Sequence, residues 1–312
     1  MDDGAGKGER PRIVASRRYG TASPLRYPGG KAALAGLFGD VIGLLGMDEA
    51  RYVEPYAGGA GAGIALLQQG LVGHLVINDI DPAVHAFWRA VVEQNEQFVE
   101  LVRSVPLSIA EWRHQREIYR RGDASDVMRL GFAFFYLNRT NRSGVLNAGV
   151  IGGQAQTGQY KIDARFNRDT LVQRLQEIGA LADRITVSDL DGRTVIQRYA
   201  GDRSTFMYID PPYVQAGSQL YLNAFDARDH RALASVVNQI DGAHWLVTYD
   251  GAPLIERLYE SKFRATLALN YSARYPGRAE ELLVASPLVA GALRKLIESE
   301  MWTSEADALA AG

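Results

Sequence analysis

Short apolar runs alternate along this chain with longer stretches in which apolar residues recur at helical spacing. Apolar, β-prone runs of this length predict buried, mostly parallel strands, and the stretches between them predict helices. The predicted strands are 51–54, 74–78, 184–188, 205–209, 244–249, 263–271 and 281–285, and the predicted helices include 32–45, 83–102, 227–240 and 252–260. The pattern therefore predicts an α/β fold with a Rossmann-like, mostly parallel seven-stranded sheet, closed at one end by an antiparallel hairpin.

The alternation of strands and helices breaks down between about residues 104 and 179. A helix-like stretch there ends at Arg139, and a Gly- and Gln-rich run to Tyr160 predicts a loop or hairpin. A loop this long usually has a function. The expected organisation is a main domain formed by 21–103 and 180–290, with a mainly helical insert at 104–179. Residues 1–20 are expected to be a disordered tail, and 291–312 a C-terminal helical tail.

Composition narrows the possible chemistry. The chain has 312 residues, 47% of them hydrophobic, and no cysteine, which excludes disulfides, thiolate zinc sites and a cysteine nucleophile. Its five histidines are scattered without ligand spacing, so no metal site is predicted. Since there is neither a signal peptide nor a run of 18 apolar residues, we expect a cytoplasmic protein without a membrane partner.

Charge is nearly balanced overall but uneven along the chain. The net charge of −2 argues against a protein that coats nucleic acid. Between Arg139 and Arg168, however, five basic residues accompany one acid, Asp163. A local basic face would suit a phosphate backbone, although a solvated surface explains the charges equally well.

The run at 205–209 ends in Asp210-Pro211-Pro212-Tyr213. Proline supplies no ladder donor, so the chain leaves the sheet at Asp210, at the carboxyl end of a strand, where open α/β sheets bind ligands. The prolines hold a carboxylate, a backbone carbonyl and the Tyr213 ring in fixed relation. Such a group can accept hydrogen bonds from an amine while the ring stacks on a flat base. The alternative interpretation is a strand that merely ends in a tight turn.

A glycine-rich segment, Pro55 to Gly63, lies between a predicted strand and a predicted helix, an arrangement that cradles nucleotide-like ligands. The G-x-G-x-x-G pattern fails in both registers, which disfavours a nicotinamide enzyme. Asp79 follows the next strand and suits a ribose diol, whereas Asp81 before Pro82 suits a helix N-cap. Lys31, after two glycines at a helix start, could reach a carboxylate or a phosphate.

These stretches resemble the Dam-type adenine-N6 DNA methyltransferases, the D12 family with α-group motif order, from about Pro24 to Ala285. The matching motifs, in order, are Tyr27-Pro28-Gly29-Gly30-Lys31, Glu54-Pro55-Tyr56-Ala57-Gly58-Gly59, Asn78-Asp79-Ile80-Asp81, Phe135-Tyr136-Leu137-Asn138-Arg139 and Asp210-Pro211-Pro212-Tyr213. The resemblance implies the S-adenosylmethionine-dependent methyltransferase fold, a target-recognition insert, and double-stranded DNA as partner of a monomer or weak dimer. It implies that Asp210 and the Pro211 carbonyl accept the N6 hydrogens of a flipped adenine.

Site residues follow from the same resemblance. The catalytic residues would be Asp210, Pro211, Pro212 and Tyr213. S-adenosylmethionine would contact Tyr27, Lys31, Glu54, Tyr56, Gly58, Gly59, Asp79, Ile80, Asp189, Leu190 and Asp210. DNA would contact Arg139, Asn141, Arg142, Ser143, Lys161, Arg274 and Arg278, residue types that read base edges or phosphates.

Two departures from the family pattern limit the transfer. The glycine loop is richer in glycine than the commonest family form, which leaves the contacting glycine open. The insert reads Asn138-Arg139-Thr140-Asn141-Arg142-Ser143-Gly144, which is not the GATC-reading version, so that specificity is not carried over. The alternatives are cytosine N4 in DNA, an amine in RNA, and a catalytically silent DNA-binding module. Protein glutamine methylation is disfavoured, because that group prefers Asn at the first motif position.

Overall fold

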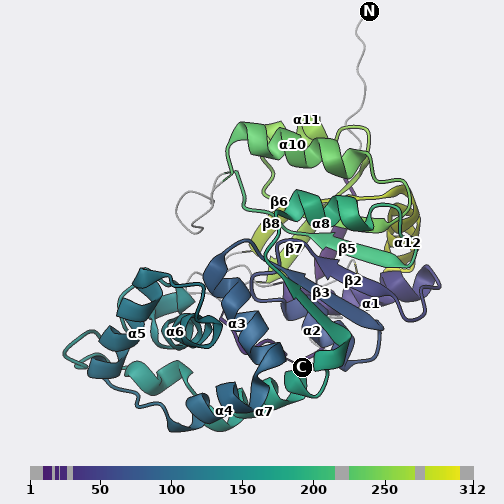
Figure 1. Ribbon diagram of the computed structural model, residues 1–312. Coiled ribbons are helices and arrows are strands. Elements are labelled where there is room, and N and C mark those ends of the chain that lie inside the picture. The colour runs from purple at the N-terminus through teal and green to yellow at the C-terminus, as the bar shows by residue number, and fades with distance from the viewer. Residues whose placement is uncertain are drawn as a thin grey trace, which may run out of the picture.

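The computed structural model describes residues 10–15, 18–20, 22–26, 31–214, 225–270 and 278–302, and in this part of the chain it forms one eight-stranded sheet. The strand order is β1-β7-β8-β6-β5-β2-β3-β4 (Figure 1). The strands are β1 (Arg12–Ala15), β2 (Arg51–Glu54), β3 (His74–Asn78), β4 (Ile185–Ser188), β5 (Thr205–Ile209), β6 (His244–Tyr249), β7 (Phe263–Asn270) and β8 (Arg278–Ala285). Only β8 pairs antiparallel, with β6 and β7, so the predicted mostly parallel α/β sheet with an antiparallel end is confirmed.

The predicted count of seven strands is wrong by one. Strand β1 lies within the stretch expected to be a disordered tail, and it pairs parallel with β7, with Ile13 opposite Leu267. Its Ile13-Val14-Ala15 run is buried, which explains why the backbone is ordered there. Four residues set among polar neighbours gave too short an apolar pattern to be recognised in the sequence.

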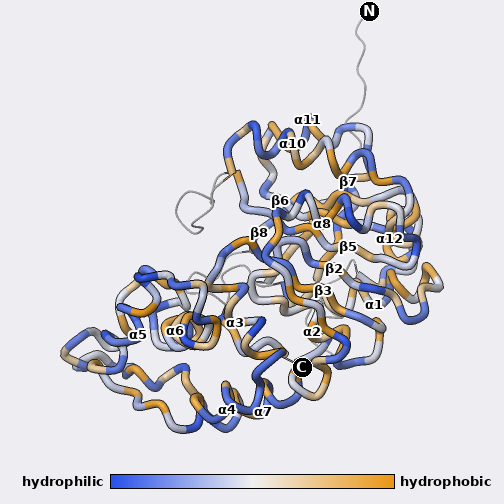
Figure 2. Tube along the Cα trace, in the orientation of Figure 1, coloured by the Kyte–Doolittle hydropathy of each residue, from blue (hydrophilic) through white to orange (hydrophobic). Residues whose placement is uncertain are grey.

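Helices cover both faces of the sheet. They are α1 (Ala35–Leu44), α2 (Gly61–Gln68), α3 (Pro82–Glu93), α4 (Asn95–Ser104), α5 (Ile109–Arg121), α6 (Val127–Thr140), α7 (Arg168–Gly179), α8 (Gly192–Tyr199), α10 (Ala227–Asn238), α11 (Pro253–Leu258) and α12 (Pro287–Glu298). One core cluster lies between the sheet and α8, α10 and α11. The other lies under α1, α2 and α12 and continues into α3 to α7, which form a helical lobe beside the sheet. Hydrophobic residues follow the strands and α6, the inner helix of that lobe (Figure 2).

The helical lobe begins earlier than the insert predicted at 104–179. The sequence predicted one helix from Ala83 to Val102, but the chain breaks at Gln94, between α3 and α4. The Asn95 side chain then donates hydrogen bonds to the carbonyls of Val91 and Leu175, each at 2.8 Å, which ties the break to α7. The break turns α4 onto α7, so both helices belong to the lobe.

The C-terminal helix is part of the core rather than a tail. Helix α12 begins at Pro287, earlier than the expected residue 291, and buries Val289 and Leu293 against the sheet layer. Trp302 follows it and donates a hydrogen bond from its indole to Asp40 at 2.9 Å. Among the described residues, no helix is both long and apolar enough to cross a membrane.

The sheet topology brings polar side chains to one edge. Strands β2, β3, β5 and β6 run parallel, so their carboxyl ends meet there. Strand β8 runs the other way and therefore starts at the same edge. As a result Glu54, Asp79, Asp210 and Thr248 lie near the carboxyl ends, and Glu281 enters this edge from an amino-terminal end.

The lobe depends on a close contact between α3 and α6. A Cβ added to Gly131 on α6 would lie 2.6 Å from the carbonyl oxygen of Ala86 on α3, which no real Cβ tolerates. We expect Gly131→Ala to lower the free energy of unfolding by about 1–3 kcal/mol, measured by urea denaturation. Gly291→Ala is the matched control, because Gly291 lies in α12 with nothing within 4 Å of its added Cβ. Gly291→Ala should raise the free energy of unfolding by about 0.4–1 kcal/mol. If both substitutions change the free energy of unfolding by the same amount, the argument from the contact between α3 and α6 is wrong.

Candidate active site

The Asp210 carboxylate, directly after β5, is held by three side chains from other parts of the fold. Its Oδ1 accepts hydrogen bonds from the hydroxyls of Tyr213 and Thr248, each at 2.8 Å. Its Oδ2 lies 3.2 Å from the Nζ of Lys31. The side chain is still 22% exposed, so the carboxylate is fixed at the sheet edge and yet reachable by a ligand.

Lys31 lies between two carboxylates. Its Nζ is 3.2 Å from Asp210 and 3.2 Å from Glu281, and it donates a hydrogen bond to the Tyr213 hydroxyl at 2.8 Å. Burial acts to lower the pKa of Lys31, but Asp210 and Glu281 outweigh it and leave the pKa above its ordinary value. Lys31 is therefore charged and joins Asp210 to Glu281 at this edge of the sheet. Its predicted contact with a cofactor stays a prediction.

Tyr213 lies across this ion cluster. Its hydroxyl is bonded to both Asp210 and Lys31, and the Lys31 ammonium lies 5.1 Å from its ring centroid. The ring is also 6.2 Å from that of Tyr249. Before it, Pro211 is buried and Pro212 half-buried, so the turn is anchored on one side. The motif predicted from the sequence thus forms one compact group.

Glu54 is turned toward helix α2. Its Oε1 accepts a hydrogen bond from the backbone N–H of Gly63 at 3.0 Å, in the first turn of that helix. Burial raises the pKa of Glu54 to about 8, against the effect of the Gly63 hydrogen bond. A Cβ on Gly63 would lie 2.6 Å from the Cδ1 of Leu75 and 3.1 Å from this carboxylate, so a side chain there would displace its neighbours. Glu54 therefore holds the glycine loop to its strand, and its predicted contact with a cofactor stays a prediction.

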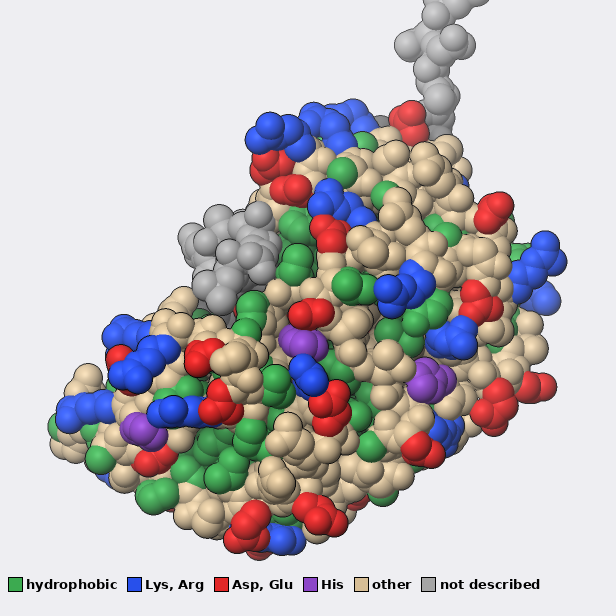
Figure 3. Space-filling model, in the orientation of Figure 1, with side chains coloured by type: hydrophobic (Ala, Val, Ile, Leu, Met, Phe, Trp, Pro, Cys, Tyr) green, Lys and Arg blue, Asp and Glu red, His purple; other side chains and the backbone are tan. Residues whose placement is uncertain are grey.

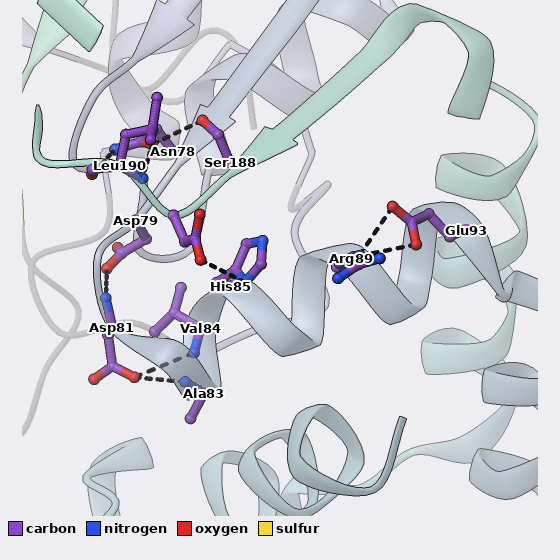
Figure 4. Close-up of polar contacts among 11 residues, drawn as sticks. Asn78, Asp79, Asp81, Ala83, Val84, His85, Arg89, Glu93, Ser188 and Leu190 are labelled. Atoms are coloured by element: carbon purple, nitrogen blue, oxygen red, sulfur yellow. Dashed lines mark hydrogen bonds and ion pairs between the residues drawn. The ribbon is translucent and has the colours of Figure 1, made fainter. Parts of the chain in front are cut away.

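Asp81 plays the part that the sequence suggested for it, whereas the predicted ribose contact of Asp79 stays a prediction. Asp81 caps α3, accepting hydrogen bonds from the N–H groups of Ala83 and Val84 (Figure 4). Asp79 accepts one from Gly58 at 2.9 Å and one from Asp81 at 3.0 Å. Burial nevertheless raises the pKa of Asp79 to about 6. The glycine loop and the acid are thus joined directly.

Asn78 fastens the loops after three neighbouring strands. Its amide nitrogen donates to the carbonyls of Pro55 and Leu190, and its oxygen accepts from the Ser188 hydroxyl and the Leu190 N–H, all within 2.9 Å (Figure 4). The N–H and the carbonyl of Leu190 are therefore both hydrogen-bonded to one side chain, which fixes the loop after β4. Asp189 next to it is largely exposed, 3.9 Å from His85.

The remaining residues predicted to contact the cofactor do not all lie in similar surroundings. Ile80, beside Asp79, is 46% exposed, so its apolar side chain is accessible to a ligand. Gly58 has φ of +47°, a conformation that favours glycine. Tyr56 instead packs its ring against Gly192 and 5.9 Å from Phe225, toward the α8 and α10 side. Gly59 accepts a hydrogen bond from the Ser23 hydroxyl at 2.6 Å through its carbonyl.

In the insert, Asn141 is not available for a base edge. It is fully buried, and its side chain accepts from the Trp112 indole at 2.7 Å and donates to the carbonyls of Val145 and Leu146. The predicted DNA contact of Asn141 is therefore wrong. The reason is that the tight turn after α6 leaves backbone carbonyls inside the protein, and this amide satisfies them.

The basic residues of the insert fall into two groups. Arg168 donates hydrogen bonds to the carbonyls of Val102, Arg103 and Val105 at the end of α4, so it is a structural cap. Arg142 and Ser143 are exposed in the turn after α6, and exposed Lys161 donates to the carbonyl of Gln156. On the face drawn in Figure 3, basic side chains of the lobe gather over α5 and mix with acids.

Arg139 is half-buried among other arginines. One nitrogen lies 3.5 Å from the carbonyl of Pro24. Burial, together with the positive charges of Arg26, Arg174 and Arg165, lowers the pKa of Arg139 to about 9. An anion near these guanidinium groups would stabilise the charged form of Arg139 and so raise its pKa.

Three predicted residues lie wholly or partly outside the described part of the chain. Tyr27, expected at the cofactor, and Arg274, expected at DNA, are not described. Arg278 begins β8, where its backbone pairs with Asn270. Their predicted roles stay predictions.

Sequence reasoning missed Thr248 and Glu281. Thr248 is a polar residue within the apolar run His-Trp-Leu-Val-Thr-Tyr, and Glu281 is an acid at the start of an apolar strand. Each breaks the pattern of a buried strand, which is the signal that could have found it.

Comparison with known proteins agrees with this site. The profile of the family described as D12 class N6 adenine-specific DNA methyltransferase matches residues 27–273. The type II methyltransferase M.MjaIII of Methanocaldococcus jannaschii is 25% identical over 175 residues, which cover 52% of this chain and 58% of that protein. The type II methyltransferase M.CviBI of Paramecium bursaria Chlorella virus NC1A is 23% identical over 253 residues, covering 78% and 91%.

One solved structure, the rRNA methyltransferase aviRa of Streptomyces viridochromogenes, is 16% identical with a TM-score of 0.36, covering 86% of this chain and 89% of that one. A likeness at that level adds nothing to the fold described above. The family match, by contrast, spans all the motifs on which the resemblance was drawn, from the lysine segment to the turn after β5. The chain belongs to the D12 class N6 adenine-specific DNA methyltransferase family.

Proposed function

We propose that this protein transfers the methyl group of S-adenosylmethionine to N6 of an adenine flipped out of double-stranded DNA. The observation that carries the proposal is the fixed but reachable Asp210 carboxylate beside the joined Gly58 and Asp79 loops. Asp210 follows β5, Gly58 follows β2 and Asp79 follows β3, and these strands are neighbours. Two strand spacings separate Asp210 from Asp79, about 10 Å, so acceptor and cofactor groups share one edge.

The residues at this edge fit S-adenosylmethionine. Asp79 can accept hydrogen bonds from ribose hydroxyls, and exposed Ile80 beside it offers an apolar surface to the adenine ring. Gly58 lets the backbone approach the ligand, and Asp189 lies at the next strand end. When bound, the cofactor supplies an electrophilic methyl group on a sulfonium.

Asp210 and the carbonyl of Pro211 would act on the acceptor amine. The N6 lone pair of adenine is delocalised into the ring, so the amine is a poor nucleophile. Acceptance of both N6 hydrogens by these oxygens localises the lone pair on nitrogen and aims it. The bond from N6 to the methyl carbon forms as the carbon–sulfur bond breaks, its electron pair stays on sulfur, and the surplus N6 proton leaves to water.

Binding of the amine at Asp210 Oδ1 would require Tyr213 to move. Asp210 Oδ1 already accepts two hydrogen bonds, one of them from the Tyr213 hydroxyl. A carboxylate oxygen has two lone pairs, so an amine can bind Oδ1 only in exchange for one of these donors. Rotation of Tyr213 away from Asp210 would free Oδ1 and present the ring to the incoming base for stacking.

We further propose that the helical lobe recognises the target sequence. Its exposed Arg142, Ser143 and Lys161 would contact DNA, and phosphate would lower the mutual repulsion around Arg139. Arg274, between β7 and β8 in the sequence, and Arg278, the first residue of β8, would contact the DNA backbone. A monomer or weak dimer that acts on cytoplasmic DNA in a restriction-modification system completes the proposal.

Asp210→Ala should reduce methyl transfer by at least about 10²–10³-fold, because the acceptor of the N6 hydrogens is lost. The variant should stay folded and still bind DNA, since the carboxylate lies at the edge rather than in the core. Tritium transfer from labelled S-adenosylmethionine to DNA measures the rate, and digestion to nucleosides identifies the methylated base. Near-normal turnover by the variant would refute the assignment, and N4-methylcytosine in the digest would favour the rival acceptor.

Arg142→Ala should weaken DNA binding roughly equally on all sequences or relax specificity at one position, depending on whether it contacts phosphate or a base. In the phosphate case, the slope of log K against log salt should fall by about 0.9. Fluorescence anisotropy at several salt concentrations measures both quantities. Arg198→Ala on α8, exposed on the opposite side of the sheet, is the matched control and should change neither.

A further inference from the structure

We propose that Thr248 and Glu281 are positioning residues for the methyl transfer, which hold the Asp210 carboxylate from two sides in the orientation that receives the adenine amine. Thr248 acts on the carboxylate directly, and Glu281 acts on it through Lys31. The inference rests on the proposed function and adds two residues that no sequence motif of the site contains.

The Thr248 arm is a directed chain of hydroxyl groups. Thr248 and Tyr208 are both buried, and their oxygens lie 2.8 Å apart. The Thr248 hydroxyl carries one proton, which it donates to Asp210 Oδ1, also at 2.8 Å. The Tyr208 hydroxyl must therefore be the donor in the first contact. Both protons point toward the carboxylate, from strands β6 and β5.

A purely structural role for Thr248 does not explain its hydrogen bond to Asp210. Two buried hydroxyls could satisfy each other with a single hydrogen bond and need no third partner. Here the chain ends on the carboxylate that the chemistry requires, at the edge where the ligand arrives. Charge-assisted hydrogen bonds are stronger and more directional than neutral ones, so this contact fixes the rotation of the Asp210 side chain.

Glu281 acts on Asp210 through the charged Lys31. Lys31 shares its ammonium equally between Asp210 and Glu281, at 3.2 Å each, and both partners of the second contact are almost fully buried. The second carboxylate stabilises the charged form of Lys31 and fixes its ammonium against Asp210 Oδ2. Glu281 therefore holds the Asp210 carboxylate through a cation whose own position it determines.

Other titratable groups surround the pair from each packed element. Tyr213 follows β5 and contacts Lys31. Tyr52 and Glu54 on β2, Tyr208 on β5 and Tyr249 on β6 interact electrostatically with Asp210. Burial raises the pKa of Tyr52, Tyr208 and Tyr249 well above the ordinary value of a tyrosine, so these three groups stay neutral over the pH range of an activity assay. Glu54, with a pKa of about 8, titrates within that pH range.

Thr248→Val keeps the shape of the side chain and removes the hydroxyl. We expect kcat to fall roughly 10–100-fold with the KM values for DNA and cofactor nearly unchanged, and Thr248→Ser to restore most of the activity. Thr205→Val is the matched control: Thr205 is equally buried on β5 but bonds Asp202 at the opposite end of the strand. If Thr248→Val and Thr205→Val have the same kcat, the Thr248 arm of the proposal fails.

Glu281→Gln keeps the shape and removes the charge. Loss of this carboxylate lowers the pKa of Lys31, so Lys31 loses its proton at a lower pH and the alkaline limb of kcat should move to lower pH. The same profile in a Glu54→Gln background separates this limb from the titration of Glu54. Glu280→Gln, an exposed neighbour paired with Arg12, is the matched control and should leave the profile unchanged. An unchanged profile in Glu281→Gln would overturn the second arm.

A readout independent of turnover comes from NMR of ε-13C-labelled lysine, since the chain has only five lysines and Lys31→Arg assigns the signal. Glu281→Gln should lower the titration midpoint of that signal in the enzyme without ligands. If wild-type protein methylates no nucleic acid, the proposed function fails. If wild-type protein is active and both the midpoint and the profile stay in place, only the positioning role of Glu281 fails.

Discussion

The edge of the sheet where the carboxyl ends of the parallel strands meet depends on one interaction, a buried ammonium shared between two carboxylates. Lys31 joins Asp210, after a parallel strand, to Glu281, on an antiparallel one. Charges this deep in a fold are stable only when paired and hydrogen-bonded, and all three donors of the ammonium have acceptors here. The ion cluster therefore ties the segment before α1, the turn after β5 and the start of β8 into one rigid group.

Hydrogen bonds between side chains and backbone hold together the loops at the neighbouring strand ends. Asn78 links the loops after β2, β3 and β4, and Asp79 binds the glycine loop through Gly58. Glu54 holds the helix that follows the loop. None of these contacts needs a ligand, so the cradle is formed by the protein itself and a cofactor would find it pre-organised. Pre-organisation of this kind lowers the entropy lost on binding.

Several predictions from the sequence failed for a common physical reason. The break between α3 and α4 and the burial of Asn141 both depend on contacts between residues far apart along the chain. An Asn in a polar loop looks the same in the sequence whether it faces DNA or satisfies buried carbonyls. Strand β1 failed differently, because a four-residue strand on the edge of the sheet has too few positions to show a period. Arg168, expected in a basic face, caps a helix that only the folded lobe brings near it.

The sequence by itself determined the α/β class, the ends of the parallel strands and the order of the motifs, because burial of a parallel strand demands an apolar run and prolines must end it. It also determined that Asp81 rather than Asp79 caps the helix, since capping is a local property. Only the tertiary structure decided which side chains surround Asp210. Thr248 and Glu281 lie 38 and 71 residues beyond it, and strand order and direction, which are set by packing over the whole sheet, bring them to the same edge.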